Sequence, residues 1–143
     1  MITLALAPAV TNTRAVSYER GLELIRAGAY FEAHEELEDE WRAAEPEERD
    51  FLQGLVHVAV AWYQAGRDNR NGCERQLEKA ARRLEPYAPD HRGLDVADLL
   101  AQVDSASARV AGGNLGLDRV EPHPFEDAVD RDVEPPRAVE EQQ

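Results

Sequence analysis

The sequence predicts an all-α fold: a compact bundle of about five helices, built from two antiparallel helical hairpins plus a C-terminal helix. Apolar residues recur at helical spacing in successive segments, and no segment has a convincing strand pattern. Gly and Pro residues separate these segments at helix-length intervals. A weak internal repeat points to the two hairpins, because a shift of about forty residues aligns Leu37 with Leu77 and Pro46 with Pro86.

Gly, Pro and helix-capping residues set the expected helix boundaries. The predicted helices cover, in order, about residues 18–27, 30–44, 46–65, 71–85 and 96–111. Ser17 can cap the first helix, and Gly28 follows its end. The second helix carries an apolar seam formed by Phe31, Leu37 and Trp41.

The remaining three helices have recognisable starts. Pro46 suits the first turn of the third helix, which is apolar nearly all round and should be the central, most buried element. Asn71 with Glu74 three residues later resembles a capping box for the fourth helix, which Pro86 ends. Asp95 can cap the fifth helix, which stops before two Gly residues.

The chain has enough apolar material, 43% of 143 residues, for one folded domain with tails. We expect an N-terminal arm at residues 1–16, a helical bundle domain at 17–113 and an acidic, Pro-containing tail at 114–143. The tail should be partly disordered, because it buries too little apolar area to offset the entropy of ordering. Its first part could still dock on the bundle through Leu115, Leu117, Val120 and Phe125.

The charge balance argues against several classes of partner. The chain has 29 acidic and 16 basic residues, a net charge of -13, which repels nucleic acids and anionic membrane surfaces. Lys79 is the single Lys among the basic residues, a halophile-like bias that fits a high-salt or GC-rich source. No segment reaches the ~20 apolar residues of a membrane span, and Met1 to Val10 lacks the basic start of a signal peptide. A lone Cys73 suits a reducing compartment and a core position, so the expected location is cytoplasmic.

One polar group stands out within the apolar pattern. His34 and Glu38 lie one helical turn apart beside the seam of the second helix, and Gln53 and His57 have the same spacing on the third helix. If these two helices pack antiparallel, the four side chains could meet. With Glu35 and Trp41 they form the candidate polar site.

The residues around this site resemble a known family. Phe31-Glu32-Ala33-His34-Glu35-Glu36-Leu37-Glu38, closed by Trp41, then Phe51-Leu52-Gln53-Gly54-Leu55 and the Asn71-Gly72 turn, are similar to domain-of-unknown-function family 309. The similarity spans about residues 18 to 90. It implies a small all-helical protein with no assigned activity. The family motif positions carried over are His34, Glu35, Glu38, Trp41, Gln53 and Gly54.

The candidate site allows a functional and a structural interpretation. His34, Glu38 and His57 would make a two-histidine, one-carboxylate metal set if they converged. In the structural interpretation His34 bonds to a carboxylate or carbonyl at the core margin, while Gln53 and His57 lie on a solvated strip. The Glu-x-x-His pattern of bundle di-iron centres is absent, and only part of a zincin motif is present. We therefore assign no metal and no cofactor.

Two function classes follow from these interpretations. The favoured one is a non-catalytic binding or interaction module, in which the His34 cluster is a buried polar clasp that holds helix register. Its partner would be an unknown protein or a second copy, and Gly54 with Ala61 could form a homodimer seam. The alternative is an enzyme that binds a metal or small polar ligand and uses His34 and Glu38 for acid–base chemistry. His91 and His123 are expected to be solvated loop residues.

Overall fold

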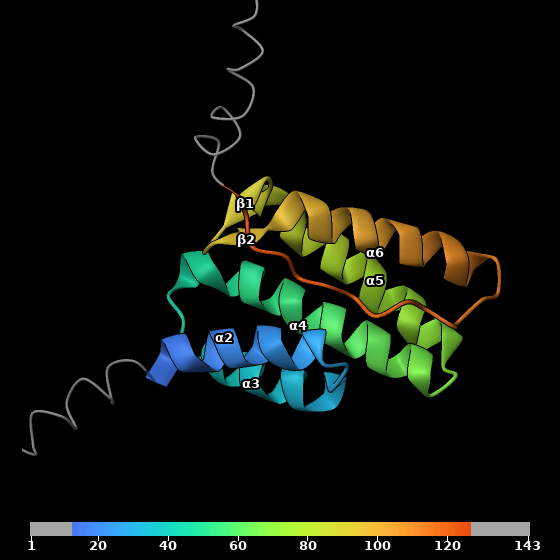
Figure 1. Cartoon of the computed structure of the whole chain (residues 1–143), viewed down its shortest axis with the longest axis horizontal. Helices are drawn as coiled ribbons and strands as arrows, with labels where there is room; N and C mark the ends of the chain where they lie inside the picture. The colour runs from blue at the N-terminus through green and yellow to red at the C-terminus, as the bar shows by residue number, and fades with distance from the viewer. Residues whose placement is uncertain (1–12, 127–143) are drawn as a thin grey trace, which may run out of the picture.

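The computed structural model describes residues 13–126 and confirms the all-α class (Figure 1). The helices are α2 (Thr13–Arg26), α3 (Tyr30–Arg42), α4 (Pro46–Gly66), α5 (Arg70–Leu84) and α6 (Val96–Ala111). A 3-10 turn (Glu85–Tyr87) and two short antiparallel strands, β1 (Asp90–His91) and β2 (Leu94–Asp95), connect α5 to α6. The predicted arm up to residue 12 and the tail from residue 127 lie outside the described part.

Helix α4 runs through the middle of the bundle, with α2 and α3 on one side and α5 and α6 on the other (Figure 1). Each helix packs on its neighbours in the chain. The centre of α4 supplies fully buried side chains, among them Phe51, Leu52, Leu55 and Val58. The compact bundle and the central position of this helix are therefore as predicted. None of the described helices is both long and apolar enough to cross a membrane.

Two predicted helix starts were wrong. Helix α2 is already helical at Thr13, where the described residues begin, so the expected cap Ser17 lies inside the helix. Helix α5 begins after Asn69, whose side-chain oxygen accepts a hydrogen bond from the Gly72 N–H at 3.0 Å. An N-cap residue has non-helical backbone angles and reaches an N–H two or three residues ahead. Asn69 meets this requirement, whereas Asn71 already lies inside the helix.

The cap predicted for the last helix is confirmed, because the Asp95 side chain accepts from the Asp98 N–H at 2.9 Å. The two-residue strands before it were not predicted, since they are too short to show a period of two. Their turn contains Arg92 with φ +49° and Gly93 with φ +78°. The turn lies beside Tyr18 of α2 and beside Glu48 in the first turn of α4.

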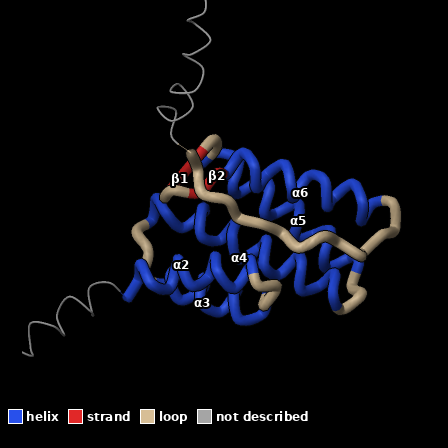
Figure 2. The backbone as a smooth tube through the Cα atoms, viewed as in Figure 1, coloured by secondary structure: helices blue, strands red, loops and turns tan. Residues whose placement is uncertain are grey.

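Residues 114–126, which we call the strap, pack on the bundle. The strap leaves the end of α6, crosses α4 and reaches the small sheet (Figure 2). Val120 is 1% exposed, and the Trp62 indole N–H donates to the Asp118 carbonyl at 2.8 Å. Of the two possibilities that the sequence left open for this part of the tail, the structure shows docking.

The small residues of α4 serve packing within the chain. A Cβ added to Gly54 would come 2.6 Å from Leu84 Cγ on α5, and Ala61 is fully buried. Gly54 therefore allows close approach of a helix, as predicted, but that helix is α5 and not a second copy. Cys73 is buried as expected, and burial raises the pKa of its thiol.

Candidate functional site

A cleft of about 200 Å³ lies between α3 and α4, and we call it the α3–α4 cleft. Its lining residues are Tyr30, Phe31, His34, Val60, Tyr63 and Gln64. The Phe31 ring centroid lies 5.1 Å from that of His34 and 5.5 Å from that of Tyr63. Phe31 is 46% exposed, which makes it the most exposed large hydrophobic side chain among the described residues. The cleft is thus an aromatic-lined surface hollow with one imidazole.

The placement of Phe31 corrects the predicted seam. In a helix of 3.6 residues per turn, Phe31 and Glu38 lie about 20° apart, whereas Phe31 and Leu37 lie about 120° apart. Leu37 accordingly points into the core and is fully buried, while Phe31 shares the cleft side of α3 with His34. The helical period contained this information, but the apolar character of Phe31 suggested burial instead.

His34 is held by its own helix. Its Nδ1 lies 2.9 Å from the Phe31 carbonyl oxygen, and its Nε2 lies 3.8 Å from Glu38 Oε1. A carbonyl oxygen only accepts, so Nδ1 carries the proton and donates. In this tautomer Nε2 is the acceptor nitrogen. The His34 side chain is 22% exposed, which makes it a half-buried residue rather than a clasp between helices.

The other predicted site residues of α3 do not face His57 on α4: Trp41 packs against the core, and Glu35 faces solvent. Glu38 also pairs with Arg42 at 3.7 Å, and Glu35 is exposed. Trp41 is half-buried, and the Arg49 guanidinium lies 4.9 Å from its ring centroid. Of the residues proposed for the polar site, the structure brings together His34 and Glu38, as their spacing predicted.

His57 on α4 forms its hydrogen bond with α5, not with α3. Its Nδ1 donates to Gln76 Oε1 on α5 at 2.7 Å, since an amide oxygen only accepts. His57 is buried, so it does not lie on the solvated strip that the structural interpretation assigned to it, while Gln53 is half-buried. Between residues 13 and 126 no group of three or more His, Cys, Asp or Glu side chains is arranged to hold a metal ion. The conditional set of His34, Glu38 and His57 is therefore not assembled, because His57 is directed to α5.

Burial lowers the pKa of His57. The hydrogen bond with Gln76 opposes this effect, and the positive charges of Arg83, Lys79 and Arg82 reinforce it. Its Nε2 is buried and has no hydrogen-bond partner in the described part of the chain. His57 is thus a neutral, interhelical polar residue, which is the role that the sequence had suggested for His34.

A second polar group was not predicted. We call it the Arg92 cluster, and it consists of Glu40, Glu48, His91 and Arg92. Arg92 Nη2 lies 3.2 Å from Glu40 Oε2, and Arg92 Nη1 lies 3.9 Å from Glu48 Oε1. His91 Nε2 lies 2.9 Å from Glu48 Oε1. Glu40 is only 3% exposed, so the guanidinium balances a buried carboxylate.

The Arg92 cluster joins the β1–β2 turn to three helices. The Arg92 guanidinium lies 4.3 Å from the Tyr18 ring centroid on α2, and the His91 ring packs on Phe51 and Tyr87 at 4.6 and 4.8 Å. His91 is therefore a packed, paired residue, and the expectation that it is solvated was wrong. His123 is 56% exposed, as expected. No local signal could reveal the cluster, because its members are brought together from distant parts of the sequence.

The chain is similar to a protein and to a family of unknown function. The chain is 34% identical over 84 residues to the uncharacterized protein YpuF of Bacillus subtilis (strain 168). The aligned part is 57% of this chain and 48% of the relative, so the chain spans about half the length of the relative it matches. Residues 18–76, which hold the α3–α4 cleft and the His57–Gln76 bond, match the family described as Domain of unknown function (DUF309), and the similarity inferred from the sequence is thereby confirmed over these residues.

Proposed function

We propose that this protein is a non-catalytic interaction module that receives one side chain of a partner protein in the α3–α4 cleft. The observation that carries the proposal is the exposed Phe31 beside Tyr63 and His34. Aromatic side chains are enriched at the surfaces by which proteins bind one another, relative to the rest of the protein surface. Core packing does not account for the position of Phe31.

The size of the cleft supports a side-chain site over a small-molecule site. Pockets that enclose drug-sized ligands usually measure about 300 to 1,000 Å³, whereas this cleft measures about 200 Å³. Its lining combines aromatic rings with the polar side chains of His34 and Gln64. This composition resembles the aromatic anchor pockets of protein interfaces.

The alternative is a small polar ligand that exchanges a proton with His34. One observation favours it: His34 Nε2 lies 3.8 Å from Glu38 Oε1, so an imidazole and a carboxylate, two groups that general acid–base chemistry uses, are neighbours beside the cleft. The two proposals differ in what contacts Phe31, because a protein partner covers this exposed ring and a small ligand beside His34 leaves much of it free.

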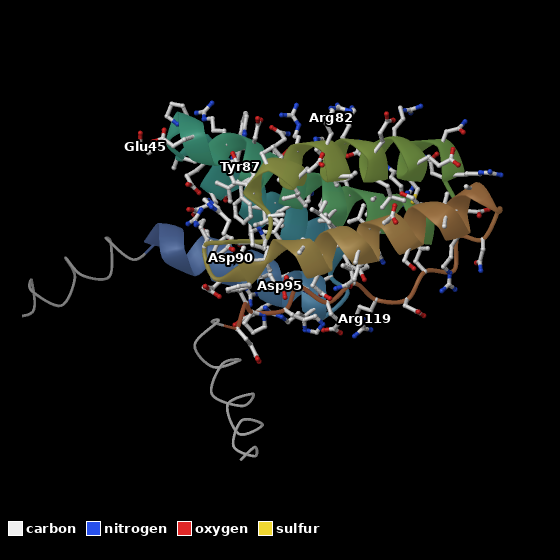
Figure 3. The ribbon with its side chains drawn as sticks, turned by 90° about the horizontal axis from the view of Figure 1, so that it is seen from above. Glu45, Arg82, Tyr87, Asp90, Asp95 and Arg119 are labelled. Atoms are coloured by element: carbon white, nitrogen blue, oxygen red, sulfur yellow. The ribbon has the colours of Figure 1, made fainter. Side chains whose placement is uncertain are left out.

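Photo-crosslinking in the source cells tests the proposal. A benzophenone amino acid replaces Phe31 in the full chain, and a matched control carries it in place of Arg82 on α5 (Figure 3). We expect a discrete protein adduct from position 31 only, and a several-fold weaker adduct when Tyr63→Ala is added. Equal labelling at both positions, or no protein adduct at position 31, contradicts the proposal.

A further inference from the structure

The strap is bound mainly through its main chain. The Trp62 indole N–H on α4 donates to the Asp118 carbonyl at 2.8 Å. Arg26 on α2 donates to the Pro122 carbonyl through Nη2 at 2.7 Å and Nε at 3.1 Å. Such contacts recognise an extended backbone without regard to the side chains it carries.

Helix α6 adds a two-point contact of the same kind. The Gln102 amide donates from Nε2 to the Glu121 carbonyl, and its Oε1 accepts from the Glu121 N–H, both at 2.8 Å. This is how a neighbouring strand would pair with residue 121. Arg109 donates to the Gly116 carbonyl at 3.0 Å. Side-chain donors from α2, α4 and α6 thus follow the strap. We call the surface that they form the strap groove, and its donors are Arg26, Trp62, Gln102 and Arg109.

Some strap side chains also pack on the bundle, and Leu115 and Leu117 lie half-buried against its core. Val120 and Pro122 are buried, whereas Asp118, Arg119 and Glu121 are exposed. Arg119 extends from the strap at one side of the molecule (Figure 3). The groove therefore selects a small branched apolar residue and a Pro two positions later, and it leaves the residue between them free to vary.

The strap does not fill the hollow in which it lies. A cavity of about 170 Å³ remains on the α6 side, lined by Gln102 and Arg109, and one of about 390 Å³ remains on the side of Gly28 and Tyr30. Trp62 and Leu117 line both cavities. The two cavities are thus parts of one wider groove above Trp62, and the strap residues around Leu117 lie between them.

We propose that the strap groove binds an extended segment of a partner protein, and that this segment contains a Val-x-Pro pattern. In the free protein the strap occupies the groove, and the partner segment displaces it. The proposal is independent of the α3–α4 cleft. Gly112 and Gly113, the latter with φ +89°, connect the strap to α6, so the strap joins the bundle through a glycine turn and not through a continuous helix. A tethered resident has a high effective concentration, so only a partner that matches the same backbone contacts can replace it.

The test uses the full chain and a fluorescent peptide with the sequence of residues 114–126. Val120→Ala weakens the resident strap and leaves the groove intact, so the peptide should bind this variant about tenfold more tightly than wild type. Adding Gln102→Ala removes a groove contact and should weaken that binding about tenfold. Gln64→Ala, which changes the α3–α4 cleft instead, is the matched control and should have no effect.

Trp62 provides a second readout. The chain contains two Trp residues, so Trp41→Phe leaves Trp62 as the sole indole. Release of the strap in Val120→Ala should shift its emission to the red, and added peptide should reverse the shift. If Val120→Ala lowers the helical circular dichroism signal, Pro122→Ala takes its place.

Three results would overturn the proposal. They are the absence of saturable peptide binding to the strap-weakened variant, equal binding of a peptide with Asp at the Val120 position, and a concentration-dependent dimer of the peptide-free protein. The last result would mean that the occupant is the strap of a second copy.

Discussion

His57 shows how a single buried residue links structure to pH. Its ring is kept neutral, because burial disfavours the imidazolium and the Gln76 oxygen needs only the Nδ1 proton of the neutral ring. The pKa of His57 is lower in the folded than in the unfolded protein. Below pH ~6.5 the unfolded chain therefore binds a proton that the folded chain resists.

The stabilisation from a neutral His57 should therefore be complete above pH ~6.5 and be lost as the pH falls toward the lower folded pKa. When the pH is lowered from neutral to mildly acidic, the unfolding free energy of His57→Gln should fall less than that of wild type. Urea denaturation at a series of pH values measures this difference. Parallel pH profiles for the two proteins would mean that His57 is not shielded from protonation.

The Arg92 cluster gives a second prediction at the residue scale. Arg92→Ala leaves the Glu40 carboxylate buried without its counter-ion and should lower the unfolding free energy by about 2 to 4 kcal/mol. Arg42→Ala removes an exposed pair with Asp39 and should cost less than about 1 kcal/mol, although the Arg42–Asp39 distance is only 2.6 Å. Chemical denaturation compares the two variants. Similar losses would show that burial does not strengthen the Arg92 pair.

Single residues also show what sequence spacing can predict. The contact of His34 with Glu38 follows from a spacing of four on one helix. The bond between His57 and Gln76 and the pair of His91 with Glu48 depend on how separate elements pack. A His in an apolar helix indicates a polar partner somewhere, but the partner's identity is a property of the packing.

At the scale of elements, the close approach of α4 and α5 depends on Gly54. A Cβ at this position would meet Leu84 Cγ and Cδ2 at 2.6 and 2.7 Å, and Leu84 is fully buried. Gly66 lies on the same helix and has no heavy atom within 4 Å of an added Cβ. Replacing each of these glycines by Ala therefore compares a position where packing is tight with one where only helix propensity changes.

We expect Gly54→Ala to lower the unfolding free energy by about 1 to 3 kcal/mol through overpacking, despite the better helix propensity of Ala. Gly66→Ala should be neutral or stabilising by up to about 1 kcal/mol. Thermal or urea denaturation of both variants checks this. A stabilised Gly54→Ala protein would show that Leu84 can be displaced at little cost.

The helices themselves were largely predictable, because apolar periodicity and Gly or Pro punctuation are local properties. Errors arose where a second residue could do the same task, as with Asn69 and Asn71 at the start of α5. The β1–β2 pair was missed because strands of two residues carry no period.

At the scale of the whole molecule, charge opposes compactness. The net charge is -13, while many of the ion pairs in the described part are exposed and therefore weak. We expect the melting temperature to rise between about 0.05 M and about 1 M NaCl, as salt screens the mutual repulsion of the carboxylates. Differential scanning calorimetry measures this, with an uncharged osmolyte at matched osmolality as the control. A melting temperature that falls with salt would mean that attractive pairs dominate.

The sequence by itself determined the helical class, the central place of α4 and the neighbouring pair of His34 and Glu38, since each depends on residues close together in the chain. Only the tertiary structure decided that Phe31 is exposed at a cleft, that His57 bonds to α5, that Arg92 balances Glu40 and that residues 114–126 bind across the bundle. These features join residues that lie far apart in sequence, and their geometry is set by how the helices pack rather than by any local pattern.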